Sequence, residues 1–313
     1  MSIWDVVGQF WGFSAIADRG GVTPDFGEFL DKRFPELNLA RTDLVGGSFG
    51  GRLNHAEKLQ HFPVVFVHGN GDRALPYGMP YMTGWATTKQ YFESQGYKSH
   101  ELYATTWGDG AITSVPFETH SKKNVMQVRK HLEAVLEYTG AKKINIVSHS
   151  MGVTLARLAI LGGDMVDSNG NHYDIGAPLT SKVNVFVGIS GPNAGLASGA
   201  ALPFVPTTDM NTGLCPGYLP GDLFGRSKVL SRLAETEHFE GKHVYSIRGM
   251  FDEVNSPFIN GTVFGADTAK IPGQDGEIAY DVPGYSHVML KDLGAEDTFK
   301  FISQNEPKSP AKA

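Results

Sequence analysis

The strongest candidate for covalent chemistry is a pair of serines that follows a short apolar run. Residues 144–147 read INIV, and Ser148, His149 and Ser150 come next, before Met-Gly and a helix-like segment. The S-x-S-x-G pattern is a variant of the G-x-S-x-G elbow, whose central serine occupies a strained turn between strand and helix. Positions two before and two after that serine must be small, because strand and helix pass close together. Ser150 is therefore the predicted nucleophile, and His149 is expected to point away from the position of the base.

A serine nucleophile also needs a base and an acid. In enzymes built around this elbow, the acid follows the serine along the chain and the histidine comes last. His287 is the one histidine beyond the carboxylates that follow the apolar run 244–247, so it is the predicted base. Asp252 comes just past that run and is the predicted acid, with Glu253 as its competitor. The alternatives are a surface-loop histidine and a solvated pair of carboxylates.

The negative oxygen of a tetrahedral intermediate needs preorganised N–H donors. One is expected from Met151, which follows the nucleophile at the start of a helix. The other is expected from the HGNG loop at 68–71, directly after the apolar run 63–67. We assign it to the N–H of Asn70, because the flanking glycines let the backbone turn toward the site.

The elements that must position these residues alternate between strand and helix from residue 63 onward. This alternation predicts right-handed crossovers and a parallel sheet, with the site at the carboxyl ends of the strands. A last helix is expected after His287. The other expected strands cover 63–67, 101–106, 144–147, 183–189 and 244–247, and the other expected helices cover 25–34, 84–93, 120–138 and 152–161.

We expect one domain over residues 63–304, with residues 1–62 as an irregular N-terminal extension packed on it. Between about 191 and 240 the alternation lapses into Gly, Pro, Ala and Leu, which predicts a cap insertion that overhangs the site. The glycine-rich stretch 46–51 follows no apolar strand and is expected to be a flexible connector. The polar tail 305–313 is expected to be disordered.

Composition narrows the class of protein. The chain has 313 residues, of which 41% are hydrophobic and 19% charged, with a net charge of -6, which favours a soluble enzyme and not a nucleic-acid binder. The lone Cys215 excludes an intrachain disulfide and a CxxC zinc site, and it is expected to be buried. No run approaches the roughly 18 apolar residues of a membrane span. The start carries Asp5 and lacks a cationic region, so an Ala15-x-Ala17 pair there does not favour a secretory signal.

Residues 167–174 and Asp109 resemble functional sites, but their sequence context argues against such roles. Residues 167–174 mimic the start of a calcium loop but lack its glycine and its final glutamate, so we expect a polar hairpin between helix and strand. Asp109 precedes the elbow and so breaks the order expected of a catalytic acid. The candidate substrate-binding residues are Trp107, just past the second core strand, and Phe204 and Leu214 in the cap.

The segments PVVFVHGNGD (63–72) and TGAKKINIVSHSMG (139–152), followed by YSIRGMFDE and GYSH, resemble the class 2 lipases, a group of α/β hydrolases. The resemblance runs from about Thr23 to Phe301. It implies an α/β-hydrolase fold, with a mostly parallel sheet, helices on both faces and a cap insertion. It also implies hydrolysis of a hydrophobic ester through an acyl-enzyme, with no cofactor or metal, and it favours a secreted protein. The residues that it implies match those above: the triad Ser150, Asp252 and His287, and the oxyanion donors Asn70 and Met151.

The sequence departs from the family pattern at two places. Ser148 stands where glycine or alanine is commoner, which leaves the chemistry intact. The cap matches no family pattern, which leaves the choice of substrate open. The HGNGD loop also resembles that of a related polyhydroxybutyrate depolymerase, which implies a polyester as the alternative substrate and a lipid or polymer surface as a partner. A non-catalytic binding protein and another serine-triad reaction, such as amide hydrolysis, are further alternatives. The sequence does not set the oligomeric state.

Overall fold

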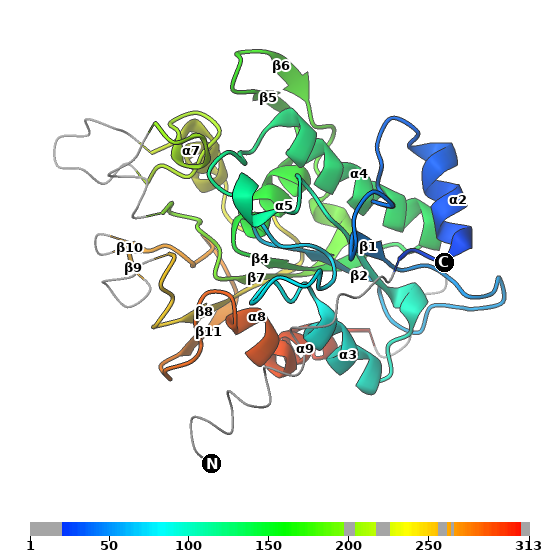
Figure 1. Ribbon diagram of the computed structural model, residues 1–313. Coiled ribbons are helices and arrows are strands. Elements are labelled where there is room, and N and C mark those ends of the chain that lie inside the picture. The colour runs from blue at the N-terminus through cyan, green and yellow to red at the C-terminus, as the bar shows by residue number, and fades with distance from the viewer. Residues whose placement is uncertain (1–20, 197–203, 217–225, 256–261, 264–265, 308–313) are drawn as a thin grey trace.

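The computed structural model describes residues 21–196, 204–216, 226–255, 262–263 and 266–307 (Figure 1). Its centre is a seven-stranded sheet in which every neighbouring pair is parallel except the first, β1 with β3. In sheet order the strands are β1 (Ser48–Phe49), β3 (Leu102–Thr105), β2 (Val64–Val67), β4 (Ile144–His149), β7 (Val183–Ile189), β8 (His243–Gly249) and β11 (Gly276–Tyr280). The predicted α/β fold with a mostly parallel sheet is confirmed.

Helices cover both faces of this sheet (Figure 1). One layer holds α2 (Pro24–Arg33), α4 (Lys122–Thr139), α5 (Met151–Leu161) and α7 (Lys228–Glu235), and the other holds α3 (Ala86–Ser94), α8 (Leu290–Leu293) and α9 (Ala295–Ser303). Short 3-10 helices lie at Ser99–Glu101, Ile112–Ser114, Thr180–Lys182 and Pro206–Thr208. Among the described residues, no helix is both long and apolar enough to cross a bilayer.

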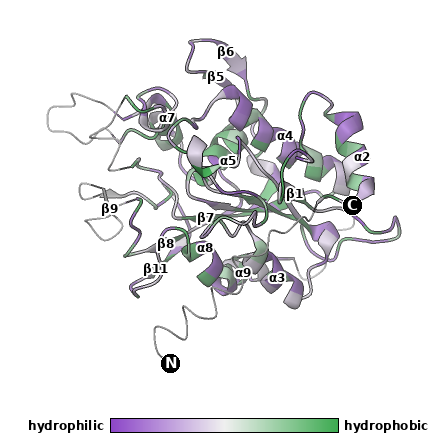
Figure 2. Ribbon diagram, viewed as in Figure 1, coloured by the Kyte–Doolittle hydropathy of each residue, from purple (hydrophilic) through white to green (hydrophobic). Residues whose placement is uncertain are grey.

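The side chains of the buried strands pack into two hydrophobic cores, one between the sheet and each helix layer. Along β2 the side chains alternate: Val65 and Val67 join the core beneath α4 and α5, whereas Val64 and Phe66 join the core beneath α3 and α9. A strand buried on both faces is apolar at most of its positions, which is why its sequence is a nearly continuous apolar run. Figure 2 shows this concentration of hydrophobic residues at the central strands and along α5.

The glycine-rich stretch 46–51 is not the flexible connector that its composition predicts. Ser48 and Phe49 form β1, which is buried and pairs with residues 104–105 of β3. A Cβ at Gly51 would lie 2.1 Å from the Thr23 hydroxyl, so glycine serves close approach here and not mobility. A strand of two residues leaves no periodic signal, which explains the wrong prediction.

The N-terminal segment that the structure describes packs on the core through α2. Phe26 is fully buried, and its ring lies 4.6 Å from that of Tyr138 on α4 and 5.2 Å from that of Tyr103 on β3. Thr23 caps α2, and Pro24 follows as its first residue, a pairing typical of helix starts. Residues 1–20, with the expected cleavage-like pair, lie outside the described residues.

The cap region is described in part. Residues 197–203 and 217–225 lie outside the described residues, as does 308–313 of the tail that we expected to be disordered. The Thr207 N–H donates to the carbonyl of Pro116 at 3.1 Å, which ties the described part of the cap to the loop after β3. Cys215 is fully buried, as predicted.

The predicted polar hairpin at 167–174 is confirmed. It joins β5 (Asp164–Val166) to the antiparallel β6 (His172–Asp174), between α5 and β7. The Asp167 carboxylate accepts hydrogen bonds from the N–H groups of Asn169 and Asn171, both at 2.9 Å, which is the geometry of a turn. A second small hairpin pairs β9 (Thr262–Val263) with β10 (Ala266–Asp267).

Candidate active site

The turn between β4 and α5 has the backbone of a nucleophile elbow. Ser150 has φ 53° and ψ −136°, a strained conformation for a residue with a side chain. A Cβ at Gly152 would lie 2.3 Å from the carbonyl oxygen of His68, so only glycine fits. Ser148 is fully buried and donates from Oγ to the Val187 carbonyl at 3.3 Å. The close approach that the motif predicts is therefore present at Gly152, and Ser148 is enclosed at the other flanking position.

Ser150, His287 and Asp252 form one continuous hydrogen-bonded chain. The three residues follow β4, β11 and β8, whose carboxyl ends meet at one edge of the sheet (Figure 1). His287 Nδ1–H donates to the two Asp252 carboxylate oxygens at 2.9 and 3.0 Å. Its other nitrogen, Nε2, lies 2.8 Å from Ser150 Oγ and can accept the hydroxyl proton. The structure thus brings together the three residues predicted as nucleophile, acid and base.

The two competing carboxylates have different partners. Asp252 faces the imidazole and also accepts from the N–H of Asn255 at 2.9 Å and from its side-chain amide at 3.0 Å. Glu253 instead accepts the main-chain N–H of His287 at 2.9 Å. Asp252 therefore has the position expected of the acid, and Glu253 holds the backbone of His287, the candidate base.

The charges of this cluster stabilise one another. Burial acts to lower the pKa of His287, but the charge and hydrogen bond of Asp252 and the charge of Glu253 raise it above its ordinary value. Burial acts to raise the pKa of Asp252, but His287 and the amide of Asn255 lower it overall. The lowered pKa of Asp252 and the raised pKa of His287 both favour a carboxylate paired with a protonated imidazole, the pairing that the predicted triad requires.

His149 has a role that the sequence did not reveal. Its Nε2–H donates to the main-chain carbonyl of His287 at 2.8 Å, and the two rings lie 5.0 Å apart. Burial, followed by the charge of His287, holds the pKa of His149 well below its ordinary value, so the ring is neutral. His149 is not hydrogen-bonded to Ser150 Oγ, and it anchors the segment that carries His287, the candidate base.

The 68–71 turn lies directly against the elbow. A Cβ at Gly69 would be 2.9 Å from the Cβ of Ser150. The side-chain amide of Asn70 donates to the Val115 carbonyl at 2.9 Å, which fixes the turn against the loop after β3. Met151 is the first residue of α5, so its N–H has no acceptor within the helix. The oxyanion role of these two N–H groups stays a prediction.

Comparison with models of known protein families identifies the family of this chain. A model of the family described as lipase (class 2) matches residues 61–300, more than half of the chain. The chain belongs to this class 2 lipase family. The resemblance that the 63–72 and 139–152 segments predict is thereby confirmed.

One solved structure supports the fold, and a second shows a weaker likeness. Aspergillus fumigatus lipase B is 14% identical to it, with a TM-score of 0.51 over 88% of this chain and 60% of that one. The mature form of Bacillus licheniformis lipase BlEst2 is 13% identical, with a TM-score of 0.48 over 82% of this chain and 97% of that one. Our chain thus spans less than two thirds of the Aspergillus structure. At such identities the likeness concerns the fold alone.

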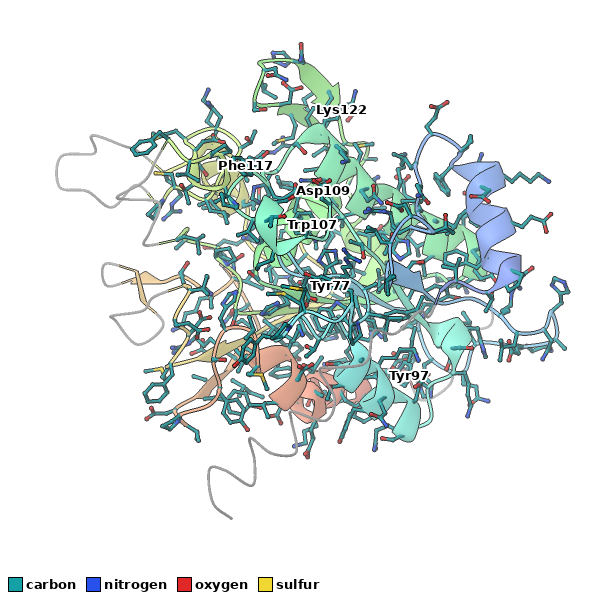
Figure 3. All side chains as sticks on the ribbon, in the orientation of Figure 1. Tyr77, Tyr97, Trp107, Asp109, Phe117 and Lys122 are labelled. Atoms are coloured by element: carbon teal, nitrogen blue, oxygen red, sulfur yellow. The ribbon has the colours of Figure 1, made fainter. Side chains whose placement is uncertain are left out.

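Of the three candidate substrate-binding residues, two are core residues. Trp107 is 1% exposed and Leu214 is 2% exposed, whereas Phe204 is 78% exposed. Trp107, labelled near the centre of Figure 3, donates from its indole to the His68 carbonyl at 2.8 Å and from its N–H to His68 Nε2 at 3.0 Å. It therefore supports the 68–71 turn. The substrate contacts stay predictions, and only Phe204 has the exposure that such a contact needs.

Two other polar residues near the candidate site, His68 and Asp109, have partners outside it. Burial lowers the pKa of His68 to about 3, so it is neutral and serves the contacts with Trp107. Asp109, labelled in Figure 3, is exposed and pairs with Lys123 at 3.6 Å. Within the described ranges, no group of three His, Cys, Asp or Glu side chains is arranged to hold a metal ion.

Proposed function

We propose that this class 2 lipase hydrolyses carboxylic esters through an acyl-enzyme formed on Ser150. The observation that carries the proposal is the unbroken chain from Ser150 Oγ through His287 to Asp252, with heavy-atom distances of 2.8 and 2.9 Å. A serine hydroxyl is a weak nucleophile until an adjacent base takes its proton, and this geometry supplies that base.

In the proposed reaction, Ser150 Oγ attacks the ester carbonyl carbon while its proton passes to His287 Nε2. The negative oxygen of the tetrahedral intermediate accepts from the N–H groups of Asn70 and Met151. His287 then gives the proton to the leaving alcohol, and Asp252 holds the imidazole in place throughout. A water molecule, activated by the same base, releases the acid and regenerates Ser150.

Exposed apolar side chains support a hydrophobic substrate. Phe117, labelled in Figure 3, is 68% exposed on the loop after β3. Other large apolar residues with exposed surface lie on the loops that follow β2, β8 and β11 and in the cap: Met79, Tyr81, Phe204, Phe251, Val254 and Val282. These loops leave the carboxyl edge of the sheet, the edge that holds Ser150. Exposed apolar surface beside a site is typical of contact with a lipid or another apolar surface.

A polyester depolymerase is the second candidate. Four of the exposed residues on these loops are aromatic, namely Tyr81, Phe117, Phe204 and Phe251. Aromatic side chains combine large apolar area with few rotatable bonds, which suits contact with a solid polymer.

The proposal is tested with initial rates on p-nitrophenyl esters from acetate to palmitate, and with release of soluble acid from polyhydroxybutyrate films. We expect ester hydrolysis, with a preference for medium or long acyl chains. If activity on films exceeded activity on soluble esters, the protein would be a polyester depolymerase, the second candidate function. A folded protein that hydrolyses neither substrate would contradict the proposal.

We also expect kcat/KM for a short ester to fall at acidic pH. The base must be neutral to accept a proton, and the pKa of His287 lies above its ordinary value. Activity should therefore be lost as pH falls through a midpoint higher than about 6.5, the pKa of a free histidine. Initial rates on a short ester without a titratable group, measured over a series of pH values, give this midpoint. A rate that stays constant well below pH 6.5 would exclude His287 as the base.

A further inference from the structure

The proposed mechanism makes no use of Lys291, a buried cation close to the candidate site. The side chain of Lys291 on α8 is 1% exposed. Its ammonium lies 3.6 Å from Asp72 Oδ2 and 3.7 Å from Asp292 Oδ1, and it donates to the hydroxyl of Thr83. Both carboxylates are almost fully buried as well. Burying an ammonium group costs free energy, and its ion pairs with Asp72 and Asp292 offset that cost. A function for this buried cluster is therefore worth seeking.

Asp72 belongs to the same turn as the proposed oxyanion donor Asn70. Its N–H closes the turn by donating to the Gly69 carbonyl at 3.1 Å. Its carboxylate accepts from the N–H of Gly84 at 3.1 Å and faces Lys291 with the other oxygen. The 68–72 turn is thus tied to α8 by a buried ion pair.

Lys291 belongs to the segment that carries the base. It lies four residues after His287, and its main-chain carbonyl accepts from the Thr88 hydroxyl on α3 at 2.9 Å. One end of the ion pair is therefore fixed in the turn beside Ser150, and the other in the helix that begins after His287.

We propose that Lys291 is a positioning residue, which holds the oxyanion turn and the base in register through its ion pair with Asp72. The inference rests on the proposed ester hydrolysis and extends it to groups that touch neither substrate nor nucleophile. Misplacement of catalytic groups by about 1 Å can reduce a rate a hundredfold, so a link of this kind bears on kcat.

The charge of Lys291 also acts on the base. The titratable groups facing His287 are Asp252, Glu253, His149 and Lys291. Asp252 and Glu253 raise its pKa, whereas Lys291 lowers it. Lys291 therefore limits how far the pKa of His287 rises, and its removal should move the pH profile of the reaction.

Asp72→Asn and Asp292→Asn form a matched pair of tests. Each leaves one ammonium with one carboxylate, and each changes the charge by the same amount, but only Asp72 lies in the turn. For Asp72→Asn we expect kcat on p-nitrophenyl acetate to fall by at least about tenfold with little change in KM. For Asp292→Asn we expect kcat close to that of the wild type. Circular dichroism and thermal melting establish that both variants are folded.

A double variant, Lys291→Met with Asp292→Asn, keeps the net charge of the cluster and removes the cation. We expect its kcat to fall and the acidic limb of its pH profile to move to higher pH. Equal kcat values for folded Asp72→Asn and Asp292→Asn, or an acidic limb unmoved in the double variant, would overturn the role of Lys291. A wild type without esterase activity would instead overturn the proposed function.

Discussion

Replacing Ser150 by alanine is expected to lower kcat on p-nitrophenyl esters by about 10⁵–10⁶-fold, since removal of a triad serine abolishes the covalent route. KM should change little, because the hydroxyl contributes little to binding the ground state. The rates are measured on purified wild type and variant in parallel. The change removes one oxygen from a strained turn, so the fold should persist.

Ser148→Ala is the matched control. It removes the same atom two residues earlier, where the hydroxyl donates to the Val187 carbonyl and not to the base. Its rate should remain close to that of the wild type. If the two variants lost activity equally, or if Ser150→Ala kept most of the wild-type rate, Ser150 would not be the nucleophile.

Replacing Arg157 by methionine is expected to lower the free energy of unfolding by about 3–5 kcal/mol, because it leaves a buried carboxylate without its partner. Arg157 lies on α5, seven residues after Ser150, and its Nε pairs with Glu240 at 2.7 Å. Both side chains are almost fully buried, at 1% and 0% exposure. The guanidinium also donates to Asn193 at 3.1 Å and to the Leu233 carbonyl at 2.9 Å, so the pair joins α5 to α7 and to the segment after β7. Urea unfolding followed by circular dichroism measures the loss.

Two controls isolate the buried charge. The double variant Arg157→Met, Glu240→Leu removes both charges and should recover most of the stability. Arg33→Met breaks an equally short pair with Glu137, at 2.6 Å, but those side chains are 60% and 45% exposed. Its cost should stay below about 1 kcal/mol. A loss for Arg157→Met as small as that for Arg33→Met would contradict this account of the pair.

Much of the fold follows from the sequence because its strands are buried on both faces. The runs at 64–67 and 183–189 are apolar or small at nearly every position, and the amphipathic pattern of α4 ends at Gly140, which adopts the left-handed cap conformation. The sequence also predicts the elbow, because the turn requires a glycine at position 152 and the motif supplies it. Chain order then selects His287, and the structure places it against Ser150.

Other features depend on tertiary contacts that leave no local pattern. Edge strand β11 alternates between exposed and half-buried residues and was not predicted. His149 gains its role from a main-chain carbonyl 138 residues away. Trp107 follows a strand end, which suggested a pocket wall, yet its indole finds an acceptor in the core and is buried. The Lys291 cluster joins the loop after β2 to α8, which is distant in sequence, so no spacing could reveal it.

The central claim is that an ester's acyl group passes through Ser150. The most direct test is mass spectrometry of the wild type, quenched with acid during turnover of a slowly deacylating ester. We expect a mass increase equal to one acyl group, mapped by peptide sequencing to Ser150 and absent from Ser150→Ala. Active enzyme with no adduct under conditions where deacylation limits the rate, or an adduct on another residue, would contradict the claim.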